Sequence, residues 1–139
     1  MSVPLERISY RNLNSRQQEA YNFQKASAVL ADYGFVTIRL TNDWRGADFI
    51  AQHMDGVNFL KVQLKGRPSF DKKYQHRDLH ICFPNAETWY LYPHDAVLTQ
   101  VLDAGMLKGT ASWDTSGAYN FPRLTKRLRG LLEPYRLGA

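Results

Sequence analysis

Two short apolar runs joined by a turn constrain this chain more than any other feature. The first run is Ala47 to His53, the second is Phe59 to Leu64, and Met54-Asp55-Gly56 lies between them. Short runs separated by a glycine-containing loop predict a β-hairpin. The second run alternates like a strand with two unlike faces, and its apolar face is formed by Leu60, Val62 and Leu64.

Three polar residues border this hairpin. Asp48 stands at the start of the first run, and Gln63 and Lys65 stand two positions apart at the end of the second, so the latter two point the same way. A hairpin places the start of its first strand beside the end of its second. A carboxylate, an amide oxygen and an ammonium are therefore expected to converge at one end of the sheet.

The pattern Ala47-Asp48 followed by Gln63-Leu64-Lys65 resembles the PD-(D/E)xK nuclease superfamily. Its restriction-endonuclease-like fold also occurs in Holliday-junction resolvases and in some intron-encoded homing endonucleases. The resemblance covers roughly residues 14 to 92 and rests on three motif residues. Ala47 replaces the usual proline, and Gln63 replaces the usual acidic residue. Glutamine offers a metal a neutral oxygen, so metal affinity is expected to be lower unless another carboxylate helps.

The resemblance implies a divalent-metal-dependent DNA endonuclease that hydrolyses phosphodiester bonds. Mg²⁺, or Mn²⁺ in its place, would be held by Asp48, the Gln63 oxygen and the Leu64 carbonyl. Some superfamily members carry a metal-site glutamate on the first helix, where this chain has Glu19. Lys65 would position or deprotonate the attacking water and stabilise the charge that develops on phosphorus. DNA is the implied partner, and cutting both strands asks for two active sites, hence a homodimer or a larger homo-oligomer.

A capping-box pattern from Ser15 to Gln18 predicts the start of that first helix, and Gly34 supplies its stop. Its core-facing stripe would consist of Glu19, Phe23, Ala26 and Leu30. Acidic residues are favoured in a first helical turn by electrostatics alone, so Glu19 has a structural reading beside the metal-site one.

The whole pattern predicts an α/β fold in which helices flank a central mixed β-sheet of about five strands, as the restriction-endonuclease-like resemblance also implies. Strands are expected near residues 36, 47, 59, 79 and 88. Later helices are expected from Pro93 to Gly105 or Gly109 and from Pro122 to Tyr135, with a loop over residues 110–120 between them. The chain is interpreted as one domain, with an arm (1–13), a core (14–92) and C-terminal helices (93–139).

Basic residues cluster directly after the hairpin. Between positions 61 and 77 there are six cations against the single acid Asp71, and Phe70 and Tyr74 are interleaved with them. Cations that meet phosphates and aromatic rings that meet bases are typical of nucleic-acid grooves. The candidate DNA-binding residues are Arg67, Lys72, Lys73 and Arg77, and a merely solvated charged loop is the alternative.

Composition narrows the possible partners and compartments. The net charge of +5 favours an anionic partner, with nucleic acid first and an acidic membrane second. The single cysteine, Cys82, excludes an internal disulfide and a Cys-rich zinc site and suits a reducing compartment. No run approaches membrane-spanning length and the N-terminus lacks a signal-peptide pattern, so a cytoplasmic protein without a membrane partner is expected. The histidines lack zinc-motif spacing, and serine-hydrolase, P-loop and dinucleotide motifs are missing.

Several alternatives stay open. Asp43 is a rival acidic candidate, but it lies among turn-forming residues, where an aspartate commonly bonds its own backbone. Trp44 and Arg45 are expected at the mouth of the site, and His76 is the histidine best placed for it. The same fold could also serve as a catalytically inactive DNA-binding module, which Gln63 favours. A third reading is a soluble interaction or toxin-partner protein.

Overall fold

The structure is a computed structural model that describes residues 5–44 and 46–138. Its helices are α1 (Ser15–Ala31), α2 (His94–Asp103) and α3 (Lys126–Leu132), with short 3-10 turns at Tyr10–Asn12, Lys72–Tyr74 and Glu133–Tyr135 and a π-helical turn at Ser112–Ser116. Its strands are β1 (Phe35–Trp44), β2 (Ala47–His53), β3 (Phe59–Leu64), β4 (Ser69–Asp71), β5 (Leu79–Asn85), β6 (Thr88–Pro93), β7 (Ala118–Asn120) and β8 (Arg136–Leu137). Arg45 and the side chains of Asp43 and Trp44 lie outside the described residues.

A six-stranded mixed sheet forms the centre of the molecule, in the order β1-β2-β3-β5-β6-β8. Strands β3 and β5 run parallel, and every other neighbouring pair is antiparallel. The predicted α/β class and mixed central sheet are confirmed, as are all five expected strands. The sixth strand, β8, and the separate two-stranded β4–β7 sheet were not predicted.

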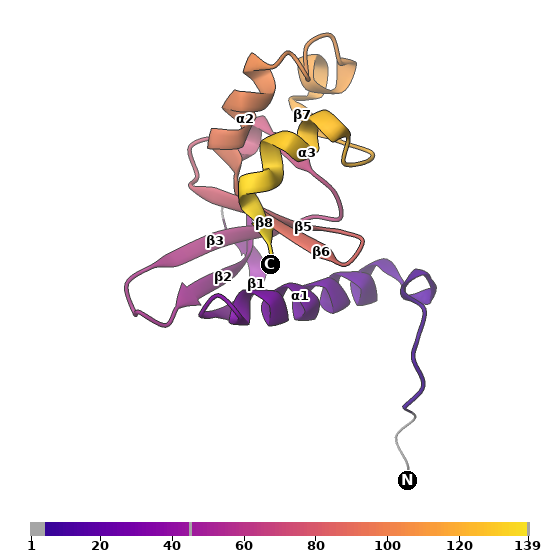
Figure 1. Cartoon of the computed structure of the whole chain (residues 1–139), viewed down its shortest axis with the longest axis vertical. Helices are drawn as coiled ribbons and strands as arrows, with labels where there is room; N and C mark the ends of the chain where they lie inside the picture. Colours follow the sequence, from indigo (N-terminus) through magenta and orange to yellow (C-terminus); the bar gives the residue numbers. More distant parts are fainter. Residues whose placement is uncertain (1–4, 45, 139) are drawn as a thin grey trace.

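Helices cover the two faces of this sheet at different places (Figure 1). Helix α1 lies along one face, where Ala26 and Leu30 form a core with Phe49, Val62 and Cys82. Helices α2 and α3 supply a second core against β5 and β6, which includes Ile81, Phe83, Tyr92, Val97 and Leu128. Full burial of such side chains contributes roughly 1.5–3 kcal/mol each. The expected alternation in β3 is confirmed, because Leu60, Val62 and Leu64 all join the α1 core.

The capping box of α1 lies one residue earlier than predicted. The Asn14 side chain accepts a hydrogen bond from the Gln17 amide, and the Gln17 side chain accepts one from the Asn14 amide. Asparagine caps as well as serine does, and the pair has the same spacing as Ser15 and Gln18. The Gln18 side chain instead donates to the backbone carbonyl of Tyr10. This bond ties the 3-10 turn at Tyr10–Asn12 to α1.

The C-terminal region also differs from the prediction. Helix α2 begins at His94, as expected, but α3 begins at Lys126, not Pro122, because the Thr125 hydroxyl caps it by accepting from the Leu128 amide. The expected loop over residues 110–120 contains β7, which pairs with β4. Across residues 5–44 and 46–138, no helix has both the length and the apolar character that crossing a membrane requires.

Candidate active site

One pocket of about 390 Å³ collects all the residues proposed as metal ligands or catalysts. Asp48 lines it from the start of β2, and Gln63, Leu64 and Lys65 line it from the end of β3. The other walls come from the first turns of α1, including Glu19, and from Tyr10. The predicted convergence of a carboxylate, an amide and an ammonium at one end of the sheet agrees with this geometry.

The register of β2 and β3 explains why Asp48 lies there. Phe49 is paired with Val62, so the preceding residue of β2, Asp48, neighbours the following residue of β3, Gln63. The Leu64 amide donates a hydrogen bond of 2.8 Å to Asp48 Oδ2. A hydrogen bond from a backbone amide to a carboxylate both orients the carboxylate and stabilises its charge. Asp48 is therefore held against the backbone of the strand that carries Gln63 and Lys65.

Gly46 determines how the chain enters β2. Its φ is +88°, a conformation that side-chain-bearing residues rarely adopt. A Cβ atom there would lie 2.9 Å from Leu79 Cδ1 and 3.2 Å from the Tyr74 ring. The absence of a side chain lets the chain turn tightly against Tyr74 immediately before Ala47 and Asp48.

Lys65 is positioned by both its backbone and its side chain. Its amide donates to the Cys82 carbonyl at 2.9 Å, which extends the β3–β5 pairing by one residue. Its Nζ lies 5.6 Å from the centroid of the Tyr74 ring, and Lys73 Nζ lies 5.4 Å from the same centroid. Cation–π attraction favours ammonium groups near this ring. The Tyr74 ring thus gathers two positive charges beside the pocket.

Glu19 lines the pocket. It is not buried, although its predicted place on the core-facing stripe would require burial. Its side chain is 58% exposed and forms an ion pair of 3.5 Å with Arg39. Glu19 and Asp48 also line an adjoining cavity of about 570 Å³ together with Arg39. The prediction of a buried Glu19 was wrong because the α1 face that packs on the sheet begins at Phe23, one turn later, which leaves Glu19 at the rim.

Four residues that line the pocket carry oxygen atoms that suit a hard divalent cation. Asp48 and Glu19 have carboxylates, Gln63 has a side-chain amide and Leu64 has a backbone carbonyl. Mg²⁺ prefers oxygen ligands and usually keeps several waters, so a small number of protein donors is compatible with it. No group of three or more His, Cys, Asp or Glu side chains able to hold a metal occurs in the described part of the chain. The oxygen atoms of these residues therefore fit a hard divalent cation, and only two of the four residues, Asp48 and Glu19, carry a negative charge.

The basic residues after the hairpin make different contacts. Lys73 shares the Tyr74 ring with Lys65, and it also pairs with Asp71 at 3.8 Å. Lys72 packs over Trp113, with 5.0 Å from Nζ to the ring centroid, and Arg77 Nε donates to the Lys73 carbonyl. Arg67 is exposed just beyond the pocket. Of the four candidate DNA-binding residues, Lys73 is the one held next to Lys65.

A buried histidine anchors this basic loop, and sequence reasoning missed it. His94 is fully buried; its Nε2 accepts from the Asp71 amide at 3.1 Å, and its Nδ1 lies 2.8 Å from Asp95 Oδ1. Asp95 Oδ2 in turn accepts from the His76 amide at 2.8 Å. The expected site histidine, His76, is exposed and contributes this backbone amide. A histidine at a helix start beside an aspartate was the available signal.

The hydrogen bonds require neutral His94 with its proton on Nδ1. Nε2 accepts a hydrogen bond from the Asp71 amide, so a proton on Nε2 would point at that N–H group and break the bond. Burial lowers the pKa of His94, and the bond to Asp95 offsets this only in part. Burial favours a higher pKa for Asp95, but the bonds from His94 and the His76 amide outweigh it, and the Asp95 pKa is lowered.

Stability should therefore fall as the solution is acidified. The stabilisation from neutral His94 is present above its ordinary pKa of 6.5 and is lost as the pH falls from there through the folded-state pKa, because the unfolded chain takes up the proton first. Urea unfolding between about pH 7.5 and 5.5 should show this decline. His94→Gln should be less stable at the upper pH but show a shallower decline, and an equally steep decline in the variant would contradict the assignment.

Comparisons with known proteins leave the family of this chain open. No protein-family model matches it, and no curated protein matches it. Among solved structures, the 1.6 Å structure of Archaeoglobus fulgidus Hjc, a Holliday junction resolvase from an archaeal hyperthermophile, matches with 12% identity and a TM-score of 0.34. The match covers 57% of this chain and 74% of that one. Similarity at this level assigns neither a fold family nor a function.

Proposed function

We propose that this protein is a divalent-metal-dependent DNA endonuclease whose active site is the pocket at the ends of β2 and β3. The observation that carries the proposal is that Asp48, Gln63, Leu64, Lys65 and Glu19 all line this one pocket. The first four come from two strand ends and the fifth from a helix, so the pocket joins residues that are distant in the sequence. The positive net charge and the cations beside Tyr74 suit a phosphate-bearing substrate.

Each side chain has a distinct role in this proposal. Asp48, the Gln63 oxygen and the Leu64 carbonyl would hold Mg²⁺ or Mn²⁺, with Glu19 acting directly or through water. The bound ion would polarise the scissile phosphate and lower the pKa of the attacking water. Lys65 would orient that water or take its proton, and its charge would stabilise the negative charge that develops on the phosphate oxygens.

Removing the Asp48 carboxylate or the Lys65 ammonium should strongly reduce cleavage without unfolding the protein. Asp48→Ala and Lys65→Ala are each expected to lower Mg²⁺-dependent nicking of supercoiled DNA by roughly 10²–10⁴-fold. Asp103→Ala and Lys108→Ala are matched controls. Asp103 is the last residue of α2 and Lys108 follows that helix, so both charges lie away from the pocket. Both should cleave at the wild-type rate.

The outcomes separate the nuclease from its main alternative. Wild-type activity in Asp48→Ala or Lys65→Ala would overturn the assignment of these residues. A wild-type protein that binds DNA in a salt-dependent way but never nicks supercoiled, linear or branched DNA with either metal would instead be a binding module. Gln63 is the residue that favours this alternative, because it brings no charge to the metal.

Gln63 provides a direct test of metal binding that does not depend on cleavage. Gln63→Glu adds a carboxylate to the donor set and should tighten Mn²⁺ binding, measured by calorimetry or electron paramagnetic resonance, by roughly tenfold or more. Gln63→Ala should weaken it. Equal Mn²⁺ affinity in all three proteins would place the ion elsewhere.

The proposal extends to a second copy of the chain, since cutting both strands asks for two active sites. The sheet face opposite α1 exposes large apolar side chains on β1 and β3: Val36 is 55% exposed, Ile38 51% and Phe59 59%. Ile38 pairs with Ile50, and Val36 and Phe59 both pair with Gln52, so these side chains form one patch. Contiguous apolar patches of this kind commonly mark protein interfaces.

Self-association through this patch can be measured directly. Light scattering coupled to size-exclusion chromatography should give a dimer or larger assembly for the wild type. Ile38→Lys, which places a charge in the patch, should shift the protein to monomer, whereas Tyr33→Lys, in the turn after α1, should not. A wild type that stays monomeric at high micromolar concentration would contradict the use of this surface.

A further inference from the structure

A second groove of about 580 Å³ adjoins the candidate active site and runs along α1. Tyr10, Asn22 and Gly66 line both this groove and the pocket that holds Asp48 and Lys65. Further along, the groove is lined by Arg7 and by Tyr21 and Lys25 of α1. A ligand in the groove would therefore pass directly into the proposed catalytic pocket.

Exposed aromatic rings and cations both line this groove. Tyr10 is 41% exposed and Tyr21 36%, and their ring centroids are 5.3 Å apart with the planes tilted by 58°. Lys25 Nζ lies 5.3 Å from the Tyr21 centroid, and Arg7 and Lys25 are both exposed. Rings on which bases stack, beside cations that meet the backbone, are the elements of single-stranded nucleic-acid sites.

The wall formed by Tyr10 is built into the fold. The Asn22 side chain donates to the Tyr10 hydroxyl at 2.8 Å, and the Gln18 side chain donates to the Tyr10 carbonyl at 3.2 Å. Both donors are on α1, one helical turn apart, so Tyr10 is tied to the helix at two points. This bonding holds the ring beside Tyr21 before any ligand arrives.

We propose that this groove binds unpaired nucleotides of the DNA substrate adjacent to the cleaved bond. A base would stack on Tyr21 or Tyr10, and Lys25 and Arg7 would contact the flanking phosphates. In a duplex each base is stacked on its neighbours and its ring faces are covered, so paired DNA cannot use these side chains in the same way. The proposal rests on the proposed nuclease function and adds the substrate class: DNA with a single-stranded segment at the site of cutting.

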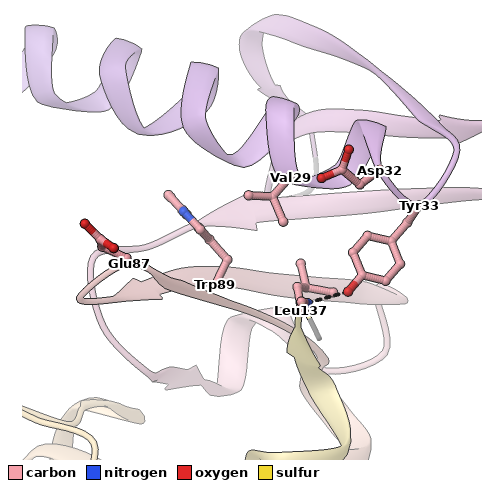
Figure 2. Close-up of a pocket in the computed structure, with 7 residues that line it drawn as sticks. Val29, Asp32, Tyr33, Glu87, Trp89 and Leu137 are labelled. Carbon is pink, nitrogen blue, oxygen red and sulfur yellow. Dashed lines mark hydrogen bonds between the residues drawn. The ribbon is translucent and has the colours of Figure 1, made fainter.

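The charges around the groove limit the path of the strand. Glu87 lines its far end, and beyond it Asp32 and Glu87 border a cavity between α1, β6 and β8 (Figure 2). Phosphates would be repelled there, whereas Arg7 and Lys25 attract them. A base stacked on Tyr21 would displace the Lys25 ammonium from the ring, which is a small cost for an exposed lysine that gains a phosphate. The bound segment is therefore confined to the end near Tyr10, Tyr21 and Lys25.

The test measures binding of single-stranded DNA to the full chain without divalent metal. A short oligodeoxynucleotide containing 2-aminopurine should bind with quenched base fluorescence, as stacking requires. Tyr21→Ala should weaken binding roughly tenfold and lose the quenching, whereas Tyr21→Phe, which keeps the ring, should bind like wild type. Tyr33→Ala is the matched control, because Tyr33 lies on the same side of the molecule, in the acidic cavity of Figure 2, and is 41% exposed. It should bind like wild type.

The results distinguish this inference from the proposed nuclease. If Tyr21→Ala loses binding but the wild type never cleaves, the groove stands and the nuclease assignment falls. The groove assignment is overturned if the wild type cleaves duplex DNA and binds single-stranded DNA no better than duplex. It is also overturned if Tyr21→Ala binds single-stranded DNA as tightly as the wild type does. Preference for RNA of the same sequence would overturn DNA as its ligand. Asp103→Ala at the end of α2, which lines neither the groove nor the catalytic pocket, should bind the oligonucleotide like wild type.

Discussion

The register of one hairpin determines the candidate site, because it lets the Leu64 amide donate to Asp48 and places Asp48 beside Gln63. In this register Val62 and Phe49 are paired and face α1, and the residues that follow and precede them come together at the strand ends. A slip of one residue would move every side chain of a strand to the other face. The apolar packing of β2 and β3 on α1 therefore selects the geometry of the polar pocket. The same apolar packing thus stabilises the fold and positions the residues of the pocket.

Beside the pocket, an aromatic ring holds the ammonium groups of Lys65 and Lys73. A buried polar network holds the chain segment that begins at β4. Tyr74 lies near Lys65 and Lys73, while Gly46 leaves room for its ring at the entrance to β2. The loop from β4 onward is tied down through His94, and the buried Tyr92 hydroxyl both donates to and accepts from the Ser69 backbone. A buried network of this kind stabilises the fold only if every member stays paired. The loop beside the pocket is thus ordered by contacts that do not involve the proposed metal ligands.

Periodicity was enough to predict the central part of the fold. Alternation identified β3 and the hairpin, and hairpin geometry alone was enough to predict that Asp48 meets Gln63 and Lys65. The two-residue β8 and three-residue β7 are too short to show a period, since their pairing is decided by tertiary contacts with β6 and β4. Likewise, the burial of His94 and the folding of Tyr10 onto α1 depend on neighbours far away in the sequence. Glu19 lines the rim of the pocket and is exposed, not part of the core as predicted, because helical spacing gives the direction of a side chain without showing where the sheet beneath it ends.

The central claim is that Asp48 and Gln63 hold a divalent ion, and a crystal soaked in Mn²⁺ tests it most directly. The anomalous difference map should show a peak bounded by the Asp48 carboxylate, the Gln63 side-chain oxygen and the Leu64 carbonyl. Soaked crystals of Asp48→Ala should lack that peak. A well-ordered pocket without a peak at saturating Mn²⁺, or a peak bound only by residues outside this pocket, would contradict the account.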